Sequence, residues 1–360
     1  MYSLNELTLE ITKQCSMGCL ICSSNGGVED PNVLSFDQIT KIIDDAKKLG
    51  VQTISISGGE PLESKICLNL IEYIDKLGLT IELYSCGNLK ENNTIIPIDE
   101  KIFLKLKTLR VKKVIFSIHG PNNLIHDQLT NKKGSFDNLV VSIKRAKIAG
   151  LHTEMHFVPV SINYHFLPEV LNLANSLKIS KISLLRFVAQ GRGKINEKIL
   201  SLSEEDMMIF KNLLENNTKY SERSIRIGAP YNCLNLDHSS CSAGLDKATI
   251  RPDGCVFPCV SMKNIELPNT PENVKSLTLI EIWNHSELFL ETRKILNTPI
   301  ETPCFTCNKN LSCFNGCDTV KILIKKVNGD SCNSYNNSPS VTTQLVKSNQ
   351  TPVFIEPGVI

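Results

Sequence analysis

Three cysteines near the N-terminus have a spacing that suits iron–sulfur chemistry. Cys15, Cys19 and Cys22 follow one another as C-x-x-x-C-x-x-C. Three thiolates on one loop can hold three irons of a [4Fe–4S] cube and leave the fourth iron open to a small molecule. A purely structural cluster would normally close with a fourth cysteine, so the triad predicts chemistry. The alternative from these residues alone is half of a zinc knuckle or a set of buried thiols.

A glycine pair one predicted unit later gives the triad its context. Gly58, Gly59, Glu60 and Pro61 follow the β-branched run 53–57. Two glycines after a strand let the backbone approach a ligand closely. By itself the segment would more often be an ordinary turn between a strand and a helix.

Together, the triad and the glycine pair resemble the radical S-adenosylmethionine (SAM) enzymes. The resemblance implies that the open iron binds the amino and carboxylate groups of SAM. It also implies that an electron from the cluster cleaves SAM to a 5′-deoxyadenosyl radical, which abstracts a substrate hydrogen. The Gly58–Pro61 segment would bind the methionine amine of SAM. One departure is Ile21, which stands where the family commonly has an aromatic residue.

A second set of cysteines near the C-terminus resembles the seven-cysteine SPASM motif. The resemblance assigns Cys304, Cys307, Cys313 and Cys332 to an outer auxiliary [4Fe–4S] cluster, and Cys241, Cys259 and Cys317 to an inner one. Cys233 lies upstream at a place where some family members supply an eighth ligand. If Cys233 is not a ligand, the inner cluster keeps an open iron. Two zinc sites are the alternative for this region.

Composition excludes several classes of function. The chain has 360 residues, a formal charge of +2 and 14 cysteines. The balanced charge argues against nucleic-acid binding, and no apolar run reaches the length of about 18 residues that suggests a membrane span. The start has neither a basic region nor a long apolar core, so no signal peptide is predicted. Many cysteines without a secretory signal favour metal binding in a reducing cytoplasm over disulfides.

Alternating strand and helix patterns must position the cysteine loop. Apolar β-branched runs at 5–11, 51–57, 79–85, 112–118, 152–160 and 180–187 predict six strands, and helices are predicted at 36–49, 64–77 and 134–149. Six β/α units predict an α/β fold with a parallel sheet, matching the partial (β/α)6 TIM-like barrel of the resembled family. Its site would lie at the C-terminal ends of the strands.

The chain is expected to divide into three parts. The partial barrel would span 1–215, a bridging region with the small cysteine-rich SPASM domain 216–335, and a tail 336–360. Within the second part, residues 250–257 predict a hairpin with Asp-Gly in its turn, and residues 278–296 predict one amphipathic helix.

Several polar residues after strands are candidates for the site. Ser117 and Arg186 are expected to contact SAM, or in the case of Arg186 a substrate carboxylate; the alternatives are a strand-end cap and a structural salt bridge. His152, Glu154 and His156 share one face of their strand, and if that face points inward, His156 could act as a base. Cys86 could return a hydrogen atom to a substrate radical, a role that the resemblance implies for some peptide epimerases. Cys67 and Cys255 are expected to be packing residues.

The sequence therefore predicts a radical SAM/SPASM peptide maturase with three [4Fe–4S] clusters. Its substrate would be a ribosomally made precursor peptide, and its product a thioether, a carbon–carbon crosslink or an epimerised residue. A flavodoxin or ferredoxin would supply electrons. Because the 14 residues before Cys15 are too few to fold into a leader-recognition domain, either a separate protein would bring the precursor or the barrel and tail would read it directly. The alternatives are an enzyme acting on a sulfatase or on a small-molecule cofactor precursor, and a zinc-binding module without catalysis.

Overall fold

The computed structural model describes residues 2–28, 30–218, 224–228, 241–264 and 271–297. Cys233, the cysteines from Cys304 onward and the predicted tail lie outside these residues. All structural statements below concern the described part of the chain.

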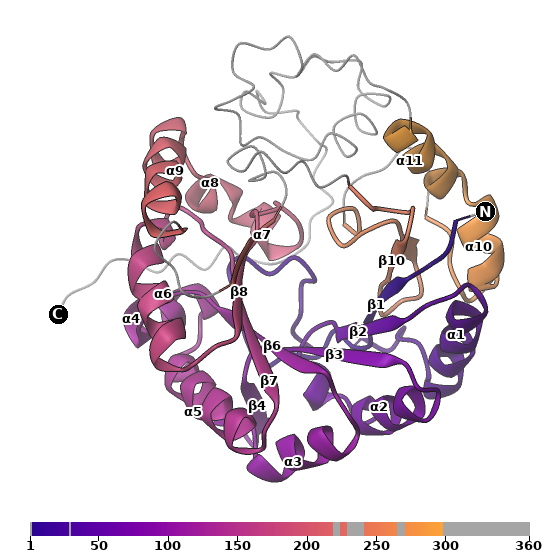
Figure 1. Ribbon diagram of the computed structural model, residues 1–360, viewed down its shortest axis with the longest axis horizontal. Coiled ribbons are helices and arrows are strands. Elements are labelled where there is room, and N and C mark those ends of the chain that lie inside the picture. Colours follow the sequence, from indigo (N-terminus) through magenta and orange to yellow (C-terminus); the bar gives the residue numbers. More distant parts are fainter. Residues whose placement is uncertain (1, 29, 219–223, 229–240, 265–270, 298–360) are drawn as a thin grey trace.

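The fold is built on one long, mostly parallel sheet that curves inside a ring of helices (Figure 1). Its strands, in spatial order, are β11 (Val256–Phe257), β10 (Lys247–Ile250), β1 (Glu6–Glu10), β2 (Thr53–Ser57), β3 (Thr80–Ser85), β6 (Lys113–Ile118), β7 (His152–Phe157), β8 (Lys181–Leu184) and β9 (Ser224–Ile227). Strands β1, β2, β3, β6, β7 and β8 are the six that the sequence predicts. The sheet continues beyond them, because β9 pairs in parallel with β8 and β10 pairs in parallel with β1.

Helices α1 to α6 lie between the parallel strands and cover the outer face of the sheet, and further helices follow β8 and β11. They are α1 (Phe36–Lys48), α2 (Cys67–Lys76), α3 (Glu100–Thr108), α4 (Asn123–Thr130), α5 (Ser135–Ile148), α6 (Leu167–Ser176), α7 (Arg192–Ile195), α8 (Glu197–Leu200), α9 (Glu204–Thr218), α10 (Leu279–His285) and α11 (Glu287–Asn297), with short 3-10 turns at Pro61–Glu63 and Tyr164–Phe166. Helix α1 begins with the predicted N-cap, Ser35, in a capping box with Gln38. No described helix is both long enough and apolar enough to cross a membrane.

Of the two local predictions for the C-terminal part, the hairpin over 250–257 and the single helix over 278–296, the structure bears out only the first. The hairpin is confirmed, since β10 and β11 pair antiparallel around Asp253 and Gly254. The single helix over 278–296 is wrong, because α10 ends and α11 begins on either side of Ser286, whose backbone is extended. The Ser286 hydroxyl donates to Glu272 Oε2 at 2.6 Å and accepts from the Phe289 amide at 3.4 Å, so it caps the second helix and turns the chain.

A two-stranded hairpin is inserted between strand β3 and helix α3, and the apolar periodicity of the sequence did not predict it. Strands β4 (Asn88–Glu91) and β5 (Thr94–Pro97) form a separate two-stranded hairpin between β3 and α3. The polar sequence of β4 and its exposed tip explain why it was missed.

Side chains alternate between an apolar face under the helices and a polar face toward the barrel interior. Ile54, Val114 and Phe116 belong to the fully buried core. The opposite face carries two neighbouring rows in register: Tyr84, Ile115, Glu154 and Lys181, followed by Ser117, His156, Ser183 and Arg226. This face therefore carries mainly polar side chains, with the buried Ile115 among them.

Candidate active site

The cysteine loop, residues 11–27, leaves β1 at its C-terminal end and folds back on itself. The Cys15 amide donates to the Gly27 carbonyl at 2.8 Å, and the Gly27 amide donates to the Lys13 carbonyl at 2.8 Å. At the other end of the loop, the amides of Gly18 and Leu20 donate to the Thr130 and Leu129 carbonyls at the end of α4. These bonds hold the three cysteines over the C-terminal ends of the strands.

The three thiols lie close enough to influence one another. Burial raises the pKa of the Cys19 thiol well above its ordinary value, and the neighbouring Cys22 and Cys15 raise it further. The Gly26 amide donates to Cys22 Sγ at 3.3 Å, the kind of bond that stabilises a cluster thiolate. Three thiolates gathered here need a positively charged partner, which iron would supply.

The donor set fits a cluster better than a single ion. Among the described residues, no three His, Cys, Asp or Glu side chains converge on a point where one metal ion could bind. A [4Fe–4S] cube is held at separate corners by separate thiolates, so it needs no such convergence. Cys15, Cys19 and Cys22 are the residues that would hold it.

The predicted glycine pair is pressed against the start of the cysteine loop. The Gly59 amide donates to the Thr12 carbonyl and the Glu60 amide to the Gln14 carbonyl, both at 2.8 Å. A Cβ on Gly58 would lie 2.5 Å from the Thr12 oxygen, and one on Gly59 only 2.1 Å from the Gln14 oxygen. Only glycine allows this approach, so the turn and the loop form one backbone layer.

The Glu60 side chain does not face the mouth of the barrel. It is fully buried and accepts hydrogen bonds from the Cys86 amide at 2.7 Å and from Ser85 Oγ at 3.0 Å. Burial raises the pKa of this carboxyl to about 7. Any contact of the segment with SAM must therefore come from its backbone, while the side chain joins β2 to the end of β3.

A segment after β8, residues 190–196, covers the other side of the cysteine loop. Arg192 Nε donates to the Cys19 carbonyl at 3.0 Å, and its NH1 donates to the Gly26 carbonyl. The Gly193 amide donates to the Cys22 carbonyl at 3.4 Å, and Asn196 Nδ2 donates to the Leu20 carbonyl at 3.1 Å. Sequence reasoning missed these contacts, because they span some 170 residues of chain.

Glu63 is a second residue that sequence reasoning missed. Its Oε1 accepts from the amides of Ser16 and Lys90, each at 3.2 Å. The carboxylate thus joins the cysteine loop to β4. In the sequence, only its position three residues after Glu60 could have indicated that Glu63 lies near the site.

Unpartnered polar atoms gather at the mouth of the barrel. Buried atoms without a protein hydrogen-bond partner include Ser16 Oγ, Glu63 Oε2, Asn88 Oδ1, His119 Nδ1, Arg186 Nε and Gln190 Oε1, all on the cysteine loop or on segments that follow strand ends. Because buried polar groups are normally paired, these atoms indicate that a polar ligand belongs here. SAM, with its amino, carboxylate and hydroxyl groups, fits that requirement. Ser117, one of the predicted SAM contacts, lies on the same side at the end of β6.

Asn163 organises the loops after β6 and β7. Its Nδ2 donates to the carbonyls of His119 at 3.0 Å and Val158 at 3.1 Å, and its Oδ1 accepts from the Val160 amide at 2.7 Å. His119 is buried, and desolvation lowers its pKa to about 4. The imidazole is therefore neutral at physiological pH and can offer its free nitrogen to a ligand.

His156 and Glu154 lie on the polar face of the barrel interior. The His156 ring packs edge-on against Tyr84 with 5.3 Å between centroids, and Glu154 accepts from Lys113 at 3.2 Å. Desolvation, with Arg226, Lys113 and Lys181 nearby, lowers the pKa of His156 to about 3. His152, by contrast, is exposed at the N-terminal end of the strand. The role of His156 as a base stays a prediction, and its low pKa does not favour it.

Cys86 lies directly beside the triad. Its thiol interacts with that of Cys15, and this contact together with burial raises the pKa of Cys86 well above its ordinary value. Cys67 is buried in the core, as predicted. Cys255 lies in the hairpin, where its Sγ accepts from Asn273 at 3.5 Å.

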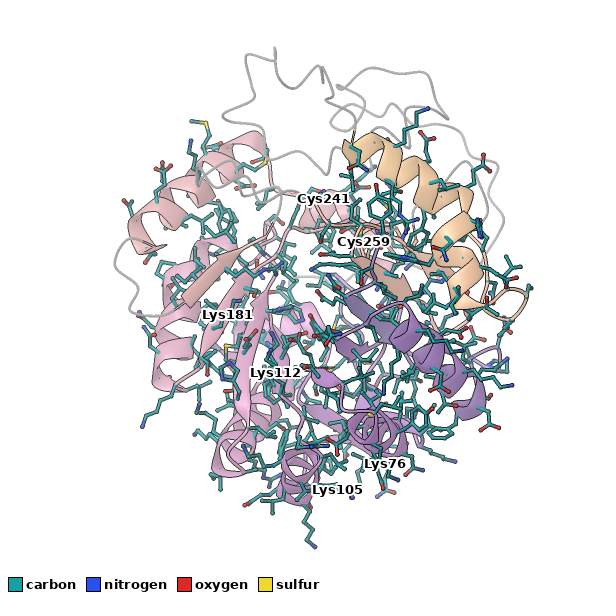
Figure 2. All side chains as sticks on the ribbon, turned by 45° about the vertical axis from the view of Figure 1, so that its right-hand side comes forward. Lys76, Lys105, Lys112, Lys181, Cys241 and Cys259 are labelled. Atoms are coloured by element: carbon teal, nitrogen blue, oxygen red, sulfur yellow. The ribbon has the colours of Figure 1, made fainter. Side chains whose placement is uncertain are left out.

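The two described SPASM cysteines lie on the opposite side of the molecule from the helices α2 and α3. Figure 2 shows Cys241 and Cys259 in the upper half of the view, and Lys76 and Lys105 near its lower edge. Their segments are joined by a hydrogen bond from the Gly244 amide to the Pro258 carbonyl at 3.2 Å. The remaining predicted auxiliary ligands fall outside the described residues.

Comparison with family profiles finds two matches. Residues 9–173 match the radical SAM superfamily, and residues 241–308 match the SPASM iron-sulfur cluster-binding domain. The first match contains the triad, and the second contains Cys241, Cys259, Cys304 and Cys307.

Curated relatives cover most of the chain. Mycofactocin maturase MftC of Mycolicibacterium smegmatis is 25% identical over 325 residues, covering 88% of this chain and 79% of the relative. PqqA peptide cyclase of Gluconobacter oxydans is 25% identical over 321 residues, covering 87% and 85%. AdoMet-dependent heme synthase of Methanosarcina barkeri is 22% identical over 303 residues, covering 79% and 83%.

Solved structures share the fold. SuiB of Streptococcus suis bound to S-adenosylmethionine superposes with a TM-score of 0.68 at 18% identity, covering 89% of this chain and 74% of that one. The structure of anSMEcpe with AdoMet and the Cp18Cys peptide gives 0.65 at 19% identity, covering 87% and 89%. The α/β barrel fold predicted from the sequence is thereby confirmed.

Proposed function

The chain is a radical SAM enzyme with a SPASM domain, and we propose that it modifies a ribosomally made precursor peptide. The observation that carries the proposal is the polar face of β6, β7 and β8, on which Ser117, His156 and Ser183 lie in register at the strand ends near the cysteine loop. Two relatives that it matches over most of their length are a peptide cyclase and a maturase. Two solved structures with the same fold contain peptides, the precursor SuiA in one and Cp18Cys in the other.

We assign the triad to the SAM-binding cluster and the backbone of Gly58 and Gly59, with Ser117 and Arg186, to SAM. When bound, the cluster and SAM supply a radical that removes one substrate hydrogen. The chain fixes where this happens, because a radical must lie next to one selected C–H bond. Arg192, Glu63 and the glycine pair hold the loop rigidly, so that the cofactor keeps one orientation.

We assign the residues of this polar face to the peptide. Neutral His156 would accept a hydrogen bond from the peptide, because its low pKa makes it a poor base, and Lys181 and Arg226 add positive charge on the same face. Cys86, beside the triad, would be the hydrogen-atom donor if the product is an epimerised residue. A thioether and a carbon–carbon crosslink are the other candidate products.

The second part of the chain completes the proposal. The domain limits of 1–215 and 216–335, the two auxiliary clusters and the closing ligand Cys233 are proposed from the SPASM motif. A flavodoxin or ferredoxin would reduce the clusters, and a separate protein could bring the precursor leader. These steps belong in the cytoplasm, where reduced partners are available.

Replacing Cys15, Cys19 and Cys22 together by Ala tests the assignment of the triad. We expect the variant to lose about one third of its iron and all SAM cleavage, because these are the only protein ligands of that cluster. Anaerobic production of 5′-deoxyadenosine with dithionite is the measurement. Wild-type turnover by the variant would end the radical SAM assignment of the triad.

Heme synthesis is the second candidate, because AdoMet-dependent heme synthases are among the relatives. Mass spectrometry separates the two. A crosslinked or thioether peptide loses two hydrogen atoms, and an epimerised peptide gains solvent deuterium without a change in composition. Turnover of a porphyrin but of no peptide would favour the second candidate.

A further inference from the structure

A buried ion pair joins the barrel to the segment that follows Cys259. Lys263 Nζ donates to Glu10 Oε1, and both side chains are only 4% exposed. Ser24 Oγ lies between them, donating to Glu10 Oε1 at 2.7 Å and accepting from Lys263 Nζ at 2.7 Å. Ser24 is two residues beyond Cys22. The ion pair therefore contacts the limb Ser23–Ser24, the part of the cysteine loop that directly follows the last cysteine of the triad.

Neighbouring contacts extend this connection on both sides. Asn264 Nδ2 donates to the Ser23 carbonyl at 2.6 Å, and Gln190 Nε2 donates to the Ser261 carbonyl. Arg251, just after β10, donates to the Lys263 carbonyl at 2.9 Å. Segment 259–264 therefore contacts the limb Ser23–Ser24 and the segment 190–196 that covers the rest of the cysteine loop.

Other lysines near the loop make weaker connections. Lys13 pairs with Asp30, but these side chains are 31% and 28% exposed. Lys275 crosses from the C-terminal part to Asn32, donating to its Oδ1 at 2.7 Å, yet its side chain is exposed. Because a buried charge without its partner is far more costly than an exposed one, only the Lys263–Glu10 pair fixes its surroundings strongly.

We propose that Lys263 is a positioning residue for SAM binding, through which the segment that follows Cys259 sets the geometry of the cysteine loop. The chain of contacts is direct: Cys259 and Lys263 share one short segment, Lys263 holds Glu10 and Ser24, and Ser24 adjoins Cys22. Loading of the inner auxiliary site through Cys259 then alters SAM binding at the first cluster. The inference rests on the proposed roles of Cys22 and Cys259 as cluster ligands.

The test compares reconstituted wild-type enzyme with Lys263→Met, Glu10→Gln/Lys263→Met and the control Lys275→Met. The readouts are the SAM dissociation constant, taken from the change in the EPR spectrum of the reduced first cluster, and the urea midpoint of unfolding. Lys263→Met leaves Glu10 charged and unpaired, so its unfolding midpoint falls. The double variant removes both charges and recovers the midpoint, but it lacks the positioning contact, so its SAM affinity stays about tenfold weaker.

Lys275→Met should bind SAM like the wild type. Normal SAM affinity in the stable double variant would overturn the proposal and leave the pair a purely structural role. Since the wild-type enzyme is measured in the same series, a failure of the proposed function would appear as absent SAM binding in the wild type and not as a difference between variants. Lys263→Arg, which can still donate to Glu10, should restore most of the affinity.

A thermodynamic cycle tests the coupling itself. Cys259→Ala should weaken SAM binding in the wild-type background but add little in the Glu10→Gln/Lys263→Met background, because the connection is already cut. Equal fold-changes in the two backgrounds would show that Lys263 does not transmit the state of the auxiliary site.

Discussion

At the scale of single residues, Glu60 has a higher pKa than an ordinary carboxylate. Burial removes water from its charged form, and no cation among the described residues lies close enough to stabilise that charge instead. Its partners are a hydroxyl and two backbone amides, which stabilise the charge only in part. The sequence marked Glu60 as a residue near the cofactor, but burial and partners are properties of the folded chain. Its role as a connection between β2 and β3 could not be read from the sequence.

Replacing Glu60 by Gln should change how stability depends on pH. The folded pKa of about 7 lies above the ordinary value of 4.5, so between these values the folded state binds a proton that the unfolded state releases. Stability contributed by this proton is complete below about pH 4.5 and is lost as the pH rises through about 7, a difference of about 3 kcal/mol.

Glu60→Gln removes the titrating proton and keeps one of the two acceptor oxygens, while its amide group replaces the other. The decline in the free energy of unfolding between about pH 5 and pH 8 should therefore be smaller in the variant than in the wild type. Urea unfolding at both values measures the difference. Parallel pH profiles would contradict the shifted pKa.

The position of Cys86 bears directly on whether the product is an epimerised residue, because an epimerase needs a hydrogen-atom donor near the cofactor. Its thiol adjoins Cys15, so it lies at the edge of the cofactor site and not in the core with Cys67. For an epimerase, Cys86→Ala should keep 5′-deoxyadenosine formation and stop the uptake of solvent deuterium into the peptide. Cys67→Ala is the control, and a variant of Cys86 that still forms deuterated peptide would remove this residue from the mechanism.

At the scale of elements, the strands were predictable because their apolar faces repeat under the helices. The six central strands and helix α1, with its Ser35 cap, follow directly from alternation and capping. The break at Ser286 and the β4–β5 hairpin did not, since a serine within an apolar periodicity and a polar edge strand give weak local signals. The contacts of Arg192 and Lys263 with the cysteine loop were also invisible, because nothing local in a sequence reports a contact across more than 150 residues.

Gly59 shows how two elements share one site. Ala at this position would place its Cβ 2.1 Å from the Gln14 carbonyl oxygen, so either the β2 turn or the cysteine loop must move. We expect Gly59→Ala to weaken SAM binding by at least tenfold, as losses around a metal site commonly do. Equilibrium dialysis with SAM measures this change.

Gly134→Ala is the matched control for Gly59→Ala. Gly134 has a φ of +82° but no heavy atom within 4 Å of the added Cβ. It should lose about 1 kcal/mol of stability from backbone strain and keep its SAM affinity. Equal losses of affinity in the two variants would show that the close approach at Gly59 is not what matters.

At the scale of the whole molecule, the described C-terminal residues 241–264 and 271–297 pack against the barrel. Strand β10 pairs with β1, which leads into the cysteine loop, and Trp283 Nε1 donates to the Tyr2 carbonyl at 3.0 Å. Arg293 is buried against Tyr2, Trp283 and Phe289, and its Nε donates to the Gly244 carbonyl at 2.7 Å, three residues after Cys241. The first residues of the chain thereby help to hold the proposed auxiliary region.

Such an arrangement predicts separable roles for the clusters. If the chain holds the three proposed cubes of four irons, the reconstituted enzyme should approach about twelve irons per chain, and Cys304→Ala with Cys307→Ala should lower this by about four. Dithionite reduces the first cluster directly, so cleavage of SAM without peptide should remain largely intact in the double variant. Peptide modification should fall much further if the proposed outer cluster takes part in electron transfer. Iron analysis, 5′-deoxyadenosine formation and peptide mass spectrometry measure the three quantities on one preparation. A zinc signal in the wild type without loss of iron in the variant would instead assign Cys304 and Cys307 to a zinc site.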